Sequence, residues 1–230
     1  MALYAIGDLH LSLAAPKPMD VFGGNWVGYM DKLNENLKVI GPGDTTVLMG
    51  DLSWSLDLPG AKADFQWMND HIPGRKIILK GNHDYWWSTA AKFQKFCDEN
   101  GFADFHLLNN NCYEYGGFAI CGTRGWFFEE ERSGQHDEKV FKRELIRLET
   151  SLKAAGDLPK LVFLHYPPRY RGYQCTEILE LLEKYEVRKC FYGHLHGPSH
   201  KLAMEGLWDG VEFRLLAADY VDFKPFKVIL

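Results

Sequence analysis

The sequence predicts an α/β fold built around a mainly parallel β-sheet. Three observations support this fold: short apolar runs recur along the chain, segments of helical character separate them, and 46% of the 230 residues are hydrophobic, enough to bury a core. The sequence contains no linker, low-complexity tract or repeat of fixed period. Residues 1–230 are therefore predicted to form a single domain.

Five apolar runs have the continuous hydrophobic character of strands that are covered on both faces. They span residues 3–7, 46–50, 76–81, 161–164 and 190–193. Right-handed crossovers would set these strands side by side and parallel, and ligands bind beyond the carboxyl ends of such strands. The residues at those ends are Asp8, Asp51, Asn82, His165 and His194.

Helices are predicted between these strands, over residues 28–40, 60–71, 88–100, 136–155 and 176–185. Gly41-Pro42-Gly43 and Ile72-Pro73-Gly74 are typical helix stops. Residues 106–122 indicate short strands around a Gly116-Gly117 turn, and residues 202–216 indicate a hairpin around residues 208–210. These segments predict a second, mixed or antiparallel sheet packed on the first.

Composition excludes several classes of protein. The five cysteines are odd in number and never spaced as CxxC, which argues against a disulfide framework and a thiolate zinc site and favours a reducing compartment. The N-terminus lacks the basic segment of a signal peptide, and no apolar stretch approaches the roughly 20 residues that cross a membrane. We therefore expect a cytoplasmic protein. The net charge of −5 disfavours nucleic acid as a partner.

The polar clusters at the strand ends point to metal chemistry when they are taken together. Asp8-Leu9-His10 or Gly50-Asp51 alone is compatible with an ordinary turn. Unrelated turns, however, have no reason to supply oxygen and nitrogen ligands at five strand ends. His194 and His196 add two imidazoles that project to the same side of an extended segment. The candidate ligands are Asp8, His10, Asp51, Asn82, His165, His194 and His196.

Seven donors are too many for one ion and fit two ions that share a carboxylate. A set of carboxylate, amide and imidazole donors without thiolate suits Mn²⁺, Fe or Zn²⁺ in a catalytic site. Two such ions, roughly 3.5–4 Å apart, would lower the pKa of a bridging water and hold the attacking and leaving oxygens of an in-line displacement.

The ordered series Asp-x-His, Gly-Asp, Gly-Asn-His-Asp, His and Gly-His-x-His resembles the calcineurin-like metallophosphoesterase superfamily, and it extends from Asp8 to His196. The resemblance implies a four-layer α/β/β/α sandwich, with two mixed β-sheets packed face to face and helices outside. It also implies that one metal is bound by Asp8, His10 and His196, the other by Asn82, His165 and His194, and that Asp51 bridges both.

The resemblance assigns a different role to His83, which would donate a proton to the leaving-group oxygen or stabilise it. Asp84 would orient His83. The residue types agree, because a histidine one position past a metal ligand lies near the phosphate, and an adjacent carboxylate would raise its pKa and fix its tautomer.

Substrate recognition has weaker signals. Phosphate sites recruit arginine, yet no arginine precedes Arg75, and Ser55 stands where the serine/threonine protein phosphatases of the superfamily place one. This departure argues against a protein phosphatase. The remaining candidates for binding substrate are Arg124, Arg169 and Arg171. The aromatic side chains that flank the motifs could stack on a nucleobase, although packing beneath the loops is favoured; they are Trp54, Trp86, Trp87, Trp126 and Phe127.

The favoured function is hydrolysis of a small phosphodiester or phosphomonoester, with nucleotides among the candidates. A nuclease is the second hypothesis, against which the acidic charge balance speaks. The third hypothesis is a non-catalytic scaffold that keeps the fold, similar to a retromer subunit of the superfamily. It is disfavoured because every ligand position is filled and His83 is retained.

Overall fold

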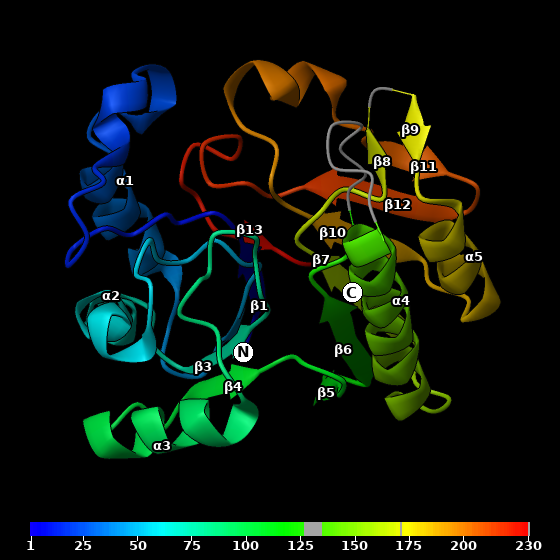
Figure 1. Cartoon of the computed structure of the whole chain (residues 1–230), viewed down its shortest axis with the longest axis horizontal. Coiled ribbons are helices and arrows are strands. Elements are labelled where there is room, and N and C mark those ends of the chain that lie inside the picture. The colour runs from blue at the N-terminus through cyan, green and yellow to red at the C-terminus, as the bar shows by residue number, and fades with distance from the viewer. Residues whose placement is uncertain (127–134, 171, 230) are drawn as a thin grey trace. The chain divides into compact units, whose positions relative to one another are not determined.

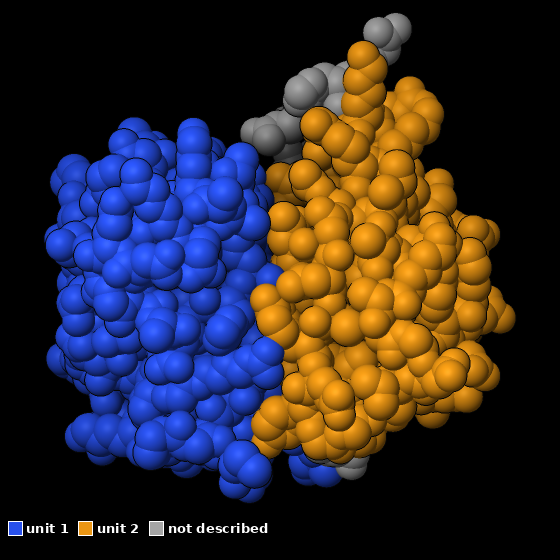
Figure 2. Space-filling view, turned by 90° about the horizontal axis from the view of Figure 1, so that it is seen from below, with its two compact units in different colours: residues 1–107, 216–230 blue, residues 108–215 orange. Residues whose placement is uncertain are grey.

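A computed structural model describes residues 1–126, 135–170 and 172–229 of the chain. These residues form two compact units, coloured separately in Figure 2. The first unit comprises residues 1–107 and 216–230, and the second comprises residues 108–215. The expectation of a single domain stays a prediction. Within the described residues, no helix has both the length and the apolar character needed to cross a membrane.

The sheet of the first unit has four parallel strands and one antiparallel edge strand, in the order β13-β1-β2-β3-β4. The register pairs Ile6 with Leu48 and Leu48 with Ile78, so three neighbouring strands end level with one another. The loops that follow them therefore leave from one edge of the sheet. The strands are β1 (Leu3–Ile6), β2 (Thr45–Leu48), β3 (Arg75–Ile78), β4 (Phe105–Leu107) and β13 (Phe226–Lys227).

Three α-helices pack on this sheet (Figure 1), and three short 3₁₀ segments precede or follow the first of them. Leu33, Phe65 and Phe93 project from the α-helices into one apolar core that includes Ile6 and Leu48 of the strands. Local sequence fixes the helix starts, because Asp57 caps α2 through Gly60 and Thr89 caps α3 through Lys92. The helices are α1 (Tyr29–Asn36), α2 (Leu58–His71), α3 (Ala90–Asn100), η1 (Met19–Phe22), η2 (Gly24–Trp26) and η3 (Leu37–Val39).

The second unit contains a six-stranded mixed sheet in the order β11-β12-β10-β7-β6-β5. Its four central strands are parallel, and an antiparallel hairpin completes each edge. The long helix α4 (Gln135–Ala154) lies along β6, and Ser151 Oγ of this helix accepts a hydrogen bond from the Gly122 amide (Figure 1). The strands are β5 (Tyr113–Tyr115), β6 (Phe118–Thr123), β7 (Lys160–Leu164), β10 (Lys189–Tyr192), β11 (Gly206–Trp208) and β12 (Val211–Leu215).

Smaller elements complete the second unit. The short hairpin of β8 (Arg169–Tyr170) and β9 (Tyr173–Gln174) follows β7, and α5 (Thr176–Lys184) leads into β10. The 3₁₀ segment η5 (Gly197–Leu202) follows the Gly-His-x-His motif.

The prediction of a mixed α/β fold with two large mixed sheets and helices is confirmed, as are the five strands, the five helices and the two hairpins. One expectation was wrong: the five strands do not share one sheet. β1, β2 and β3 belong to the first unit, whereas β7 and β10 belong to the sheet of the second. The cause is that β6, α4 and β7 form a strand–helix–strand unit, so β7 pairs with β6 instead of β3.

Candidate functional site

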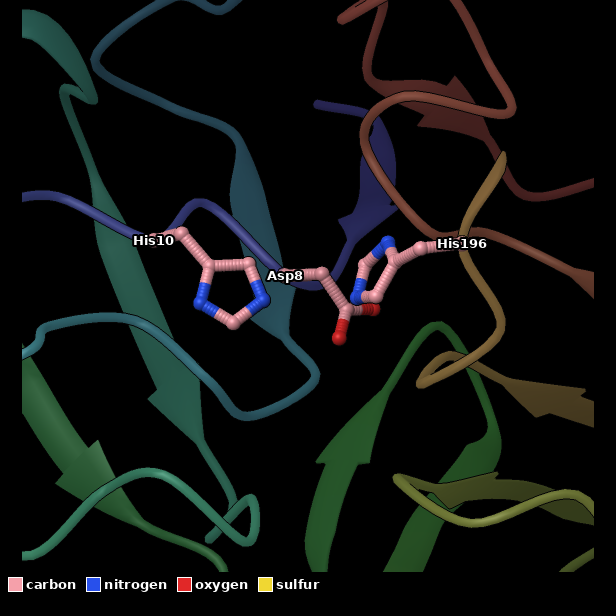
Figure 3. A group of neighbouring side chains, drawn as sticks. All are labelled: Asp8, His10 and His196. Atoms are coloured by element: carbon pink, nitrogen blue, oxygen red, sulfur yellow. The ribbon is translucent and has the colours of Figure 1, made fainter. Parts of the chain in front are cut away.

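Four predicted ligands, Asp8, His10, Asp51 and Asn82, follow the level ends of β1, β2 and β3 in the first unit. The chain beyond β1 continues beside the chain beyond β2, since the Asp8 amide donates to Gly50 O at 2.9 Å and the His10 amide donates to Asp51 O at 2.9 Å. Asp8, His10 and Asp51 are all at most 2% exposed. The sheet edge therefore presents two carboxylates and an imidazole from a buried position. Figure 3 shows the side chains of Asp8 and His10 on the segment that follows β1.

The backbone at these positions is strained. Asp8, His10 and Asp51 have φ values of 60°, 47° and 51°, and His194 in the second unit has φ 72°. Residues with a Cβ adopt this left-handed region at a cost, and such strain concentrates at functional sites. Four of the seven predicted ligands carry it, which favours a functional reading of these loops over ordinary turns.

The glycines of the Gly-Asp and Gly-Asn motifs are required by close packing between two loops. A Cβ on Gly81 would lie 2.1 Å from Asp51 Oδ1 and 2.2 Å from Asp51 N. A Cβ on Gly50, which has φ 87°, would lie 2.5 Å from Gly81 N. The motifs after β2 and β3 therefore touch backbone to backbone, and this contact holds Asp51 beside Asn82.

Asp51 contacts both His10 and His83. Its Oδ1 accepts a hydrogen bond from the His83 amide at 2.7 Å, and its Oδ2 lies 3.8 Å from His10 Nε2. A carboxylate with one oxygen turned to each side suits the bridging role that the resemblance implies.

Asp84 ties the site loops together through the backbone. Its Oδ2 accepts from the amides of Asp51 at 2.8 Å and Gly81 at 2.7 Å, and its Oδ1 accepts from the Leu52 amide at 2.9 Å and Trp86 Nε1 at 3.0 Å. Burial raises the pKa of Asp84, while these backbone donors oppose the rise. The expectation that Asp84 orients the His83 ring stays a prediction. The hydrogen bonds of Asp84 join the loop after β3, which carries His83, to the loop after β2.

The His83 ring is half-buried and has aromatic neighbours. Its Nδ1 lies 3.4 Å from the Tyr85 hydroxyl, and its centroid lies 4.5 Å from that of Trp54 and 5.9 Å from that of His10. The sequence did not single out Tyr85, which is 56% exposed. The position of Tyr85, two residues after His83, was the one sequence signal that could have indicated this contact.

Trp54 and Trp86 pack beneath the loops. This agrees with the expectation that packing is favoured over stacking on a nucleobase. Trp54 is 9% exposed and stacks on His10 with a centroid distance of 4.9 Å, and Trp86 is 2% exposed. Phe127 lies outside the described residues.

The second unit contributes imidazoles from the ends of β7 and β10. His165 is fully buried, its amide donates to Arg124 O at 3.1 Å, and its carbonyl accepts from the Gly193 amide at 3.0 Å. This bond brings the two strand ends together, so the rings of His165 and His194 lie 5.2 Å apart between centroids. Tyr166 packs edge-on against His194 at 4.6 Å, a contact that the sequence did not reveal.

Two of the three candidate substrate arginines already have carboxylate partners in the second unit. Arg124 lies 3.5 Å from the buried Glu144, which also binds Arg147 at 2.6 Å. Arg169 is paired with Asp209. Arg171 lies outside the described residues. A role for these arginines in phosphate binding stays a prediction.

The donor chemistry fits the expected metal ions. Buried carboxylates and imidazoles at strand ends match the preferences of Mn²⁺, Fe and Zn²⁺. Burial raises the pKa of Cys97 and Cys121 to about 12, so these thiols are protonated at neutral pH and unsuited as metal ligands.

Comparison with known proteins identifies one family, and similar solved structures include two proteins from Aquifex aeolicus and Thermus thermophilus. The family model described as calcineurin-like phosphoesterase matches residues 1–198, which confirms the resemblance. None of the curated proteins matches the sequence. A protein of unknown function from Aquifex aeolicus, AQ665, is 18% identical with a TM-score of 0.51, covering 98% of this chain and 95% of its own. The protein TT1561 of Thermus thermophilus is 12% identical with a TM-score of 0.57, covering 98% and 97%. At these identities the two structures support the fold alone.

Proposed function

Because the chain belongs to the calcineurin-like phosphoesterase family, we propose that it is a dinuclear metal-dependent hydrolase of small phosphoesters. The family supports metal-dependent phosphoester hydrolysis in general. The two-metal centre and the substrate class are the proposal, with phosphomonoesters and phosphodiesters, nucleotides included, as candidates.

The proposal rests most on one observation, the ends of β1, β2 and β3. Three adjacent parallel strands end level, and Asp8 and Asp51 follow them in strained, buried positions that a structural loop does not need. Parallel sheets bind ligands at this edge. The chemistry of the donors then selects a metal cation over other ligands.

We assign the metal ligands as the resemblance implies. Asp8, His10 and His196 would hold one ion, Asn82, His165 and His194 the other, and Asp51 both. The ions, Mn²⁺, Fe or Zn²⁺, would neutralise charge on the phosphoryl group and lower the pKa of a coordinated water.

His83 is the proposed proton donor to the leaving-group oxygen. Its amide donates to Asp51 Oδ1, so the residue is held directly beside a ligand while its ring remains half-buried and accessible. The neighbouring Tyr85 hydroxyl, 3.4 Å from Nδ1, is placed to fix the orientation of the ring.

The charges favour small substrates. The chain carries a net charge of −5, and Arg124 and Arg169 are engaged by Glu144 and Asp209. A long polyanion needs a track of uncommitted cations, so a nuclease fits less well.

The proposed function is tested with aryl phosphate mono- and diesters in the presence of Mn²⁺, with a chelator as control. We expect turnover that the chelator abolishes and that added Mn²⁺ restores. Metal binding without turnover on any ester would favour a non-catalytic scaffold instead.

The role of His83 is tested by His83→Ala, for which we expect turnover to fall by about 10²–10⁴-fold with the metal content unchanged. His71→Ala, on α2 of the same unit, is the matched control and should retain activity. Metal content is measured by elemental analysis. Loss of metal in the His83 variant would contradict the role of proton donor.

A further inference from the structure

Lys17 is a cation beside the first-unit part of the proposed centre that the sequence did not single out. Its ammonium lies over the Trp54 ring, 3.3 Å from the centroid. The same ring stacks on His10 at 4.9 Å and contacts His83 at 4.5 Å between centroids. One indole therefore contacts the ammonium, a proposed metal ligand and the proposed proton donor.

We propose that Lys17 binds a second anionic group of the substrate, so that the preferred substrates carry a second phosphate next to the one that is attacked. This inference rests on the proposed function. It assigns a substrate class, small diphosphates such as phosphoanhydrides, to the same site.

Lys17 contacts an aromatic ring and, in the described part of the chain, no carboxylate. Its side chain is exposed, and within the described part of the chain no carboxylate forms an ion pair with it. Arg124 and Arg169, the arginines expected to bind phosphate, each have a carboxylate partner. A cation without a carboxylate partner gains more from an incoming phosphate than one that must first leave a carboxylate.

The segment that carries Lys17 is anchored on both sides. The Leu13 amide donates to Asp64 Oδ1 at 2.9 Å, and Trp54 Nε1 donates to Met19 Sδ at 3.4 Å. Between these anchors, the Lys17 amide donates to Ala15 O at 2.8 Å, and prolines flank Lys17 on both sides. The backbone thus holds Lys17 next to Trp54, while its four-carbon side chain keeps the freedom to reach a ligand.

The position of Lys17 matches a second charge better than the first. Metal ions at the strand ends would neutralise the phosphoryl group that is attacked. The ammonium lies on the Trp54 ring, which also contacts His10 and His83, and a Lys ammonium serves phosphate as a compact point charge without the geometric demands of arginine. A substrate with a single phosphate would leave this cation unused.

The binding test uses Mn²⁺-loaded protein and two non-hydrolysable probes, methylenediphosphonate and phenylphosphonate, measured by titration calorimetry. For Lys17→Met we expect the Kd of methylenediphosphonate to rise about tenfold, as for loss of one charge-assisted hydrogen bond, and that of phenylphosphonate to change less than about twofold. Lys17→Arg should keep most of the affinity. Lys62→Met, an exposed lysine on α2, is the control and should change neither Kd.

The outcomes separate this inference from the function on which it rests. Metal-dependent hydrolysis of 4-nitrophenyl phosphate with unchanged diphosphonate affinity in Lys17→Met would overturn the role of Lys17 and leave the proposed function standing. An equal loss of affinity for both probes in Lys17→Met would overturn the second-phosphate assignment, since Lys17 would then bind the first phosphate. Absence of metal-dependent binding and hydrolysis in the unaltered protein would overturn both proposals.

Discussion

The strand ends of the two units are built differently. In the first unit, Asp84 joins the loops after β2 and β3 through three backbone amides, and Gly81 packs against Asp51 without room for a Cβ. In the second, His165 is held by backbone hydrogen bonds to Arg124 and Gly193. His194 and His196 are half-buried, whereas Asp8, His10 and Asp51 are buried.

This difference indicates a division of labour. The first unit supplies buried carboxylates whose positions are part of its own packing, because moving them would break the contacts of Asp84 and Gly81. The second carries imidazoles, of which those of His194 and His196 are half-buried. Substitutions at Asp51, Gly81 or Asp84 should therefore disturb folding and metal binding together, and those at His194 or His196 should disturb metal binding alone.

The largest effect on stability is expected for Gly81→Ala. The new Cβ would lie 2.1 Å from Asp51 Oδ1 and 2.2 Å from Asp51 N, and backbone atoms cannot yield as a flexible side chain would. We expect the free energy of unfolding to fall by more than about 4 kcal/mol, measured by urea denaturation. Gly43→Ala is the control, since its Cβ would meet only Met1 Cγ at 3.6 Å, and it should change stability by less than about 0.5 kcal/mol. Equal stability of the two variants would mean that the loops after β2 and β3 are not in close contact.

Asp84→Asn comes next. Each carboxylate oxygen accepts hydrogen bonds from two N–H groups. The side-chain NH₂ of an asparagine would therefore face two buried N–H donors in place of one of these oxygens. We expect a loss of about 3 kcal/mol in the free energy of unfolding. Trp86→Phe removes a single donor and some packing, and should cost about 2 kcal/mol. A smaller loss for Asp84→Asn than for Trp86→Phe would show that the loops are held by apolar packing instead of this carboxylate.

The local parts of the fold follow from the sequence better than the long-range parts. Continuous apolar runs marked the strands correctly, since burial on both faces leaves a pattern within a few residues. The assignment of β7 and β10 to a second sheet depends on strand pairing, which short-range patterns do not determine.

The same limit applies to the candidate site. Motif residues such as Asp8 and Asp51 were recognisable because their types and spacing carry the chemistry. The pairing of Arg124 with Glu144, and the contact of Lys17 with Trp54, join residues far apart in the sequence. The left-handed backbone at Asp8 and Asp51 also lies beyond the sequence, because neither residue type requires it.

The smallest effect on stability is expected for His196→Ala, and it tests the second half of the comparison. His196 is half-buried and immediately precedes η5, so the metal-free variant should differ in free energy of unfolding by less than about 0.5 kcal/mol. Metal affinity should fall at least about tenfold, because an imidazole ligand is lost. Lys201→Ala, on η5, is the control and should keep both properties. If metal-free His196→Ala loses as much stability as Asp84→Asn, the imidazole belongs to the packing of its unit, and the two sets of strand ends are built alike after all.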